Sequence, residues 1–258
     1  MARKGSPKGA GIREVERFPL GRRIEHFLIM IAVNVLAFTG LPQKYFYTGW
    51  GRRIIQLLGG IEQTRFIHRT FALLLVGVSL YHLGTLLWQL LRGVSGPPPM
   101  ALTMKDFRDM VDDFRYLLGL TRERPRYDRF DYQQKLDYWF VVWGTTIFIV
   151  TGFIMWFPEW VGRYLPGIVI PAARVAHGGE ALLAVYAVIL WHFYAAHFRP
   201  QVFPFDPAMW TGKISIERLR EEHPLEYERL IKRLGVHHQA ELQTVSTSED
   251  DGGSPDPT

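Results

Sequence analysis

Residues 70–91 read TFALLLVGVSLYHLGTLLWQLL and contain no lysine, arginine, aspartate or glutamate. A helix needs about 20 mainly apolar residues to cross the roughly 30 Å hydrocarbon core of a bilayer. Similar stretches occur elsewhere, with their few charges near the first residues, and the expected spans are about 24–41, 66–91, 136–157 and 173–198. Buried helices of soluble proteins are rarely apolar on all sides for so long. The sequence therefore predicts an all-α membrane protein, a bundle of four transmembrane helices.

The charged residues are segregated from these spans. Lysine and arginine gather in residues 1–23 and 92–135, whereas the connections after the first and third spans hold few. The positive-inside rule then puts both termini and the middle loop in the cytoplasm, with the chain in the inner (cytoplasmic) membrane. No cleavable signal peptide is expected, because the first apolar run begins late. The net charge of +5 reflects this bias, and no nucleic-acid partner is expected, since the basic residues flank membrane spans.

This pattern divides the chain into a basic N-terminal segment (1–22), a transmembrane domain (23–200) and a cytoplasmic tail (201–258). Within the middle loop, apolar residues recur at helical spacing over 104–118, which predicts an interfacial helix against membrane lipid. A short helix is expected after Pro224, and the last dozen residues have the composition of a disordered segment. The chain has no cysteine, so an iron–sulfur cluster or a c-type haem must belong to a partner.

Histidines carry the strongest functional signal. Six of the nine lie within or at the ends of the apolar stretches: His26, His68, His82, His177, His192 and His197. A neutral imidazole in lipid must find a partner for its polar ring, and histidines paired at equal depth are what an axially ligated haem requires. A single membrane histidine can instead be a hydrogen-bonding group between helices.

An internal repeat ranks these histidines. Span one ends in Thr39-Gly40 and span three carries Thr151-Gly152, and each following span opens with arginine three residues before His68 or His177. A second histidine follows fourteen or fifteen residues later, which is about 21 or 22 Å along a helix and allows two stacked haems. His68 and His177 form the best outer pair.

The inner pair is less certain from sequence. His192 has two possible partners, His26 and His82, and depth favours His26 because both it and His192 lie near the inner edge. His82 is kept as an alternative ligand, and an interfacial role is expected for His197. A third haem, bound by His82 and His197, remains an open alternative to two.

Several motifs resemble a known family. Arg23-Ile24-Glu25-His26-Phe27, Ile67-His68, Val150-Thr151-Gly152 and Trp191-His192-Phe193-Tyr194 are similar to the di-haem cytochrome b (gamma) subunits of membrane-bound formate dehydrogenases, and the nickel–iron hydrogenase subunits are also similar. The resemblance covers roughly residues 17–235. It implies two haem b groups with axial iron ligands His26, His68, His177 and His192, the outer haem on His68 and His177 and the inner on His26 and His192. The spacing from His177 to His192 is one residue longer than this family leads us to expect.

The resemblance also implies a quinone site at the entrance to span three. Residues 130–135, FDYQQK, match the family's quinone contact region, but Asp131 stands where asparagine is usual and Gln133 where glycine is. Asp131, Gln134 and His192 are the candidates for contacting menaquinone or ubiquinone. The alternative is an ordinary capped helix entrance.

The expected function is therefore electron transfer within a larger complex. The chain would pass electrons between an extracytoplasmic redox subunit and the membrane quinone pool, most simply through the outer and then the inner haem. That partner would be an iron–sulfur, molybdopterin, hydrogenase or multihaem cytochrome c protein, and the chain a subunit of an oxidoreductase rather than an independent enzyme. The alternatives are a haem-free membrane anchor and a stand-alone transmembrane haem reductase.

Overall fold

A computed structural model describes residues 13–93, 99–200 and 202–235. The chain forms two compact units, which we describe separately. The membrane unit consists of Glu16–Pro97 and Leu136–Lys213, and the polar unit of Met1–Val15, Pro98–Lys135 and Ile214–Thr258. The C-terminal segment expected to be disordered lies outside the described residues.

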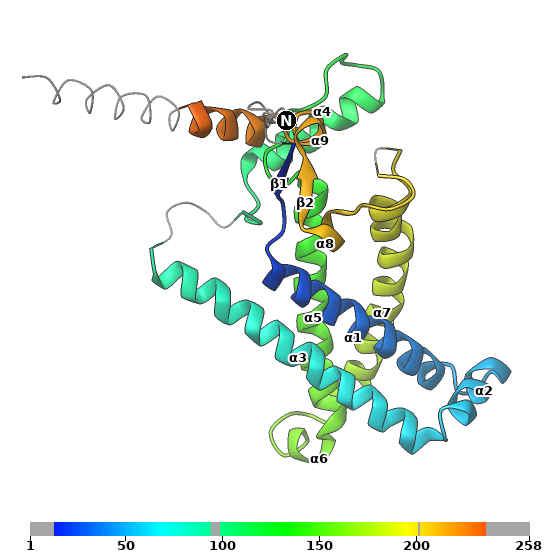
Figure 1. Cartoon of the computed structure of the whole chain (residues 1–258). Coiled ribbons are helices and arrows are strands. Elements are labelled where there is room, and N and C mark those ends of the chain that lie inside the picture. Colours follow the sequence, from blue (N-terminus) through cyan, green and yellow to red (C-terminus); the bar gives the residue numbers. More distant parts are fainter. Residues whose placement is uncertain (1–12, 94–98, 201, 236–258) are drawn as a thin grey trace, which may run out of the picture. The chain divides into compact units, whose positions relative to one another are not determined.

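The four predicted spans are confirmed as helices long and apolar enough to cross a membrane. They are α1 (Leu20–Lys44), α3 (Ile61–Leu91), α5 (Tyr132–Trp156) and α7 (Val169–Ala187), the last continued by two π-helical segments, η1 (Val188–His192) and η2 (Tyr194–Phe198) (Figure 1). Each helix begins about one turn before its predicted span. The reason is that hydropathy marks only the apolar residues, whereas a helix backbone also accommodates polar residues such as Arg22 and Glu62 in its first turns.

Short elements connect the spans at one end. A helix α2 (Gly49–Leu57) follows α1, and a single turn, α6 (Pro158–Val161), follows α5. Between α2 and α3, Gly59 and Gly60 have φ of 91° and 96°. Glycine adopts such angles without steric cost, which lets the chain reverse between the two helices. The first span also continues through Pro42 to Lys44 instead of ending near residue 41.

The spanning helices bury few of their own side chains. α1 packs along α3 and also contacts α7, whereas α5 makes only sparse close backbone contacts with the other elements (Figure 1). Ala32, Leu75 and Val78 are buried, while most large apolar side chains of the spans are exposed. A membrane surrounds such helices with lipid, and sparse contacts between them leave room for a cofactor.

The polar unit contains α4 (Met104–Leu117), α9 (Ile216–Glu222) and helical residues 224–235. A two-stranded sheet pairs β1 (Glu14–Glu16) with β2 (Lys213–Ser215). The acidic face of α4 points inward, because Asp106, Asp109 and Asp113 are all buried. Its apolar face is largely exposed. Of the side chains expected to lie along the membrane interface, Met110 is partly buried and the others are exposed: Phe107, Val111, Phe114, Leu117 and Leu118.

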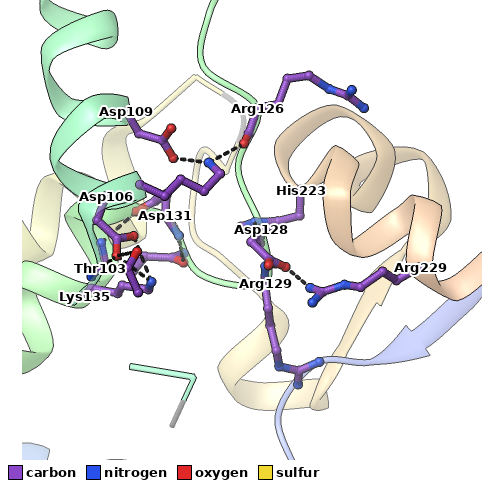
Figure 2. Close-up of polar contacts among 12 residues, drawn as sticks. Thr103, Asp106, Asp109, Arg126, Asp128, Arg129, Asp131, Lys135, His223 and Arg229 are labelled. Atoms are coloured by element: carbon purple, nitrogen blue, oxygen red, sulfur yellow. Dashed lines mark hydrogen bonds and ion pairs between the residues drawn. The ribbon is translucent and has the colours of Figure 1, made fainter. Parts of the chain in front are cut away.

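Ionic contacts hold the inward face of α4 in place (Figure 2). The ammonium of Lys135, in the first turn of α5, lies 2.8 and 2.9 Å from the two carboxylate oxygens of Asp106. The hydroxyl and backbone N–H of Thr103 donate to the same carboxylate at 2.7 Å, which caps α4. Lys105 pairs with Asp109 and donates to the carbonyl of Arg126 at 2.8 Å. The α4 helix is therefore fixed by its polar side.

Acidification is expected to loosen this attachment. Burial raises the pKa of Asp106, but hydrogen bonds from Lys135 and Thr103 outweigh it and hold the pKa below its usual value. A carboxyl with a lowered folded-state pKa stabilises the fold above its unfolded pKa and loses that contribution as the pH falls through its folded pKa. We expect α4 amides to lose hydrogen-exchange protection, corrected for intrinsic rates, below about pH 4.

The half-exposed Asp112 of the same helix provides the matched control. Asp106→Asn should lower protection at neutral pH and flatten the decline on acidification, and Asp112→Asn should do neither. An unchanged pH profile in Asp106→Asn would show that this ion pair does not hold α4.

Candidate haem-binding site

Two histidines from different spans meet in the membrane unit. His68 lies in α3 and His177 in α7, and their ring centres are 6.3 Å apart. These are the residues that the internal repeat predicts as the outer pair.

Each of these rings is held by a threonine on a neighbouring span. The hydroxyl of Thr39 lies 2.9 Å from Nδ1 of His68, and that of Thr151 lies 2.9 Å from Nδ1 of His177. The hydroxyl of Thr39 donates its only proton to the carbonyl of Val35, and that of Thr151 donates its proton to the carbonyl of Ile147. Each threonine oxygen must therefore accept from the imidazole, which puts the ring proton on Nδ1 and leaves the lone pair of Nε2 available to a metal.

The glycines of the two Thr-Gly pairs make room for the rings. A Cβ atom on Gly40 would lie 3.0 Å from Cε1 of His68, and one on Gly152 would lie 3.5 Å from Cε1 of His177. The first distance is too short for an unstrained contact, whereas the second is ordinary van der Waals contact. Each repeat thus supplies a threonine acceptor and a close backbone approach to the histidine of the next span.

A second pair is formed by His26 of α1 and His192 of η1, with ring centres 6.0 Å apart. Its surroundings differ from those of the first pair. Oδ2 of Asp137 lies 2.9 Å from Nδ1 of His192, so the acceptor is a carboxylate instead of a hydroxyl. Nδ1 of His26 is buried and has no hydrogen-bond partner among the described residues.

The π-helical segments account for the long spacing between His177 and His192. A π-helix is bonded from residue i to i+5, so each π turn holds about one residue more than an α turn. The extra residue is accommodated at Val188–His192, where α7 changes to η1. His192 can therefore face His26 although it is one residue further along the chain.

Both pairs fit axial ligation of a porphyrin iron. Two metal–imidazole bonds of about 2 Å, plus roughly 1 Å from each nitrogen to its ring centre, place the ring centres about 6 Å apart. In the described chain, no group of three or more His, Asp or Glu side chains gathers around a possible bare ion. Two histidines at this spacing could hold an iron whose other four ligands come from a macrocycle.

His82 occupies a different environment. Its Nδ1 lies 2.7 Å from Oε2 of Glu25 and 2.8 Å from Nη1 of Arg22, and its Nε2 lies 3.1 Å from the hydroxyl of Tyr138. Both ring nitrogens are engaged within the protein. The structure thus brings His26, and not His82, beside His192.

His197 is placed near the end of the last span, in η2. Its ring stacks on Phe193 at 5.2 Å between centres. Among the described ring contacts, it meets no other histidine, so the structure does not form a third histidine pair.

Comparison with known proteins identifies the family to which the chain belongs. Residues 17–212 match the family described as prokaryotic cytochrome b561, which is most of the chain and includes all four spans. The chain belongs to the prokaryotic cytochrome b561 family. It is therefore a membrane cytochrome b that functions in electron transfer. The family implies haem b as the cofactor.

Curated relatives of this cytochrome b561 family member cover most of its length. It is 22% identical over 207 residues to the cytochrome b556(Fdn) subunit of the nitrate-inducible formate dehydrogenase of Escherichia coli K12. The match covers 80% of this chain and 87% of the relative. The same subunit from Escherichia coli O157:H7 and from Shigella flexneri matches equally. The resemblance seen in the sequence motifs is confirmed.

The candidate quinone residues Asp131 and Gln134 lie in the polar unit, at the start of α5. The backbone N–H of Gln134 donates to Oδ1 of Asp131 at 2.7 Å, and Oε1 of Gln134 accepts from the N–H of Asp131 at 3.3 Å. The two side chains thus cap the first turn of the helix, as the alternative interpretation of this segment predicts. A cap does not exclude contact with a ligand, so the two roles have to be separated by experiment.

The sequence does not reveal that Thr39, Thr151 and Lys44 lie beside the histidines of the outer pair. In the sequence, Thr39 and Thr151 are recognisable as parts of a repeat. The Thr-Gly pair that stands one span before each histidine is the signal that could have predicted their contacts with the imidazoles. Lys44 stands out in the sequence only as one of the few basic residues of the first connection. Its ammonium fills the space beside Gly178, next to His177, and a Cβ on that glycine would lie 2.8 Å from Nζ.

Proposed function

We propose that this chain is a di-haem electron-transfer subunit that connects an extracytoplasmic redox partner with the membrane quinone pool. The observation that carries the proposal is the presence of two histidine pairs, whose ring centres are 6.3 and 6.0 Å apart. His68 and His177 would hold the outer haem, and His26 and His192 the inner. A haem in each pair would supply one-electron transfer without bond making, since an iron with two histidine ligands is coordinatively saturated.

The protein's own residues do the positioning. Thr39 and Thr151 hold the outer imidazoles in the tautomer that presents Nε2, and Asp137 does the same for His192. The helices exclude water from both pairs once lipid surrounds them. Arg22, Glu25, His82 and Tyr138 form a connected polar chain within the spans, of the kind that moves protons in membrane proteins.

Orientation and partner belong to the same proposal. The lysine and arginine bias supports cytoplasmic termini in an inner membrane, with the pair His68 and His177 towards the outside. The named relative is a subunit of formate dehydrogenase, which supports an extracytoplasmic oxidoreductase as the partner here. The exposed apolar face of α4 would rest against membrane lipid.

Spectroscopy and purification separate this function from its rivals. A dithionite-reduced minus oxidised spectrum of the purified chain should show b-type haem bands, whereas a haem-free anchor would show none. Mild solubilisation should yield a complex with a redox subunit. A stand-alone reductase would instead purify alone and reduce its acceptor unaided.

Quinone reduction tests the inner end of the proposed pathway. Asp131→Ala and Gln134→Ala should slow donor-driven quinone reduction about tenfold or more, because a polar group at the quinone head binds it or supplies protons. Both haems should remain reducible by the donor. The measurement is the quinone-reduction rate together with the haem spectrum of the same sample.

Asp131→Asn separates ligand contact from helix capping. Asparagine keeps a side-chain oxygen for the N–H of Gln134 and so retains the cap. If the carboxylate itself acts on the quinone, the Asn variant is slow as well. A normal rate in both the Asn and Ala variants, with intact haem spectra, would leave these residues as structural only.

A further inference from the structure

The two histidine pairs differ in what accepts the hydrogen bond from Nδ1. At the outer pair both acceptors are threonine hydroxyls, which are neutral. At the inner pair the acceptor on His192 is the carboxylate of Asp137, at 2.9 Å. His26 has no acceptor among the described residues. Within the described part of the chain, only one of the four proposed ligands is therefore bonded to a group that can carry a negative charge.

This charge is not balanced nearby. Among the described residues, the carboxylate of Asp137 contacts the imidazole of His192 and no lysine or arginine. Glu25 provides the contrast at the same end of the helices. Glu25 directly precedes the proposed ligand His26 in the sequence, but its carboxylate lies 2.8 Å from Nη1 of Arg22. Among the described contacts, Asp137 is thus the carboxylate that touches an inner ligand without a lysine or arginine beside it.

A carboxylate acting through histidine changes the redox balance of a bound iron. Hydrogen bonding to a carboxylate makes the other ring nitrogen a stronger electron donor. A fixed negative charge also favours the ferric over the ferrous state by Coulomb attraction, which is weakly screened inside a membrane. A hydroxyl dipole has a smaller effect in the same direction. Hydrogen bonding around the ligands is one of the means by which proteins set haem potentials.

We propose that Asp137 is a positioning residue that lowers the reduction potential of the inner haem. It does so by accepting the Nδ1 hydrogen bond of His192 and by placing an unbalanced negative charge beside that ligand. The two haems then differ in potential because their histidines have different acceptors. This inference rests on the proposed assignment of His26 and His192 as the inner ligands.

The test is a spectroscopic redox titration of the purified full-length haem protein and its Asp137→Asn variant. Asparagine keeps an oxygen acceptor for Nδ1 but removes the charge. One haem component should move to higher potential while the other stays. A change of about tenfold in the ferric-to-ferrous ratio corresponds to about 59 mV for one electron. The low-spin ferric EPR signal of the same haem should shift as well.

Two further variants identify the component and control for structure. The component that moves in Asp137→Asn should be the one missing from His26→Ala. Asp112→Asn, which removes a half-exposed carboxylate on α4, should leave both potentials unchanged. If Asp137→Asn loses haem, Asp137→Ser supplies a neutral hydroxyl acceptor like those of the outer pair. Loss of haem there too would make Asp137 a structural requirement and overturn the tuning role.

The remaining outcomes distinguish this inference from the proposed function. Two haems in Asp137→Asn with unchanged potentials, or a shift of the other component, would overturn the role of Asp137 alone. A wild-type protein that binds no haem would contradict the proposed function itself.

Discussion

His177→Ala is expected to reduce the haem content of the purified protein from about two to about one per chain, since the remaining imidazole cannot hold a low-spin iron alone. His177 lies in α7 with its ring centre 6.3 Å from that of His68, and Thr151 fixes its tautomer. His68→Ala should lose the same haem. A pyridine haemochrome assay on equal amounts of protein measures the loss.

His197→Ala is the matched control for this loss. It removes a histidine from the same span, but one whose ring stacks on Phe193 and meets no other histidine among the described contacts. Both haems should be retained. A His177→Ala protein with its full haem content would overturn the outer assignment, and loss of haem in His197→Ala would point to a third haem.

Replacing the inner histidines should distinguish the two partners available to His192. His26→Ala should lose the inner haem, because the rings of His26 and His192 lie 6.0 Å apart between centres. His82→Ala should keep both haems, since Nδ1 and Nε2 of His82 already bond to Glu25 and Tyr138. Haem content and the reduced-minus-oxidised spectrum report the result for each variant.

The opposite pattern would be informative. Loss of haem in His82→Ala with both haems kept in His26→Ala would show that the internal repeat, which sets His82 opposite His192, describes the holoprotein better. His82→Gln is a further variant for this comparison. Glutamine can retain one of the polar contacts of His82 with Glu25, Arg22 or Tyr138, but it does not ligate iron in the manner of imidazole.

Sequence alone was sufficient for the four spans, and it predicted that His68 and His177 lie close together. Spans are determined by length and hydropathy, because the bilayer sets both. The outer pair followed from the repeat: His68 and His177 stand at equivalent positions, each one span after a Thr-Gly pair, and the structure brings their rings together. The exposed apolar face of α4 also followed from helical spacing.

Tertiary structure decided what depends on rotation about a helix axis. Residue counting gives depth, and depth alone left both His26 and His82 as partners for His192. The contacts show His82 engaged with Glu25, Arg22 and Tyr138. They also show a π turn at Val188–His192 that accommodates the extra residue. A change of hydrogen-bond register rotates every later side chain, and no local feature of the sequence signals it.

The acceptor of each ligand was likewise visible only in three dimensions. Asp137 is the single charged residue between Leu136 and Phe157, and its place near the start of that span does not reveal which side chain it contacts. Its contact with His192 depends on how α5 and η1 approach each other, which sequence separation does not determine. The sequence by itself therefore predicted which residues could bind haem and at what depth. Packing of the helices decided which of them face one another and what charge lies beside each ring.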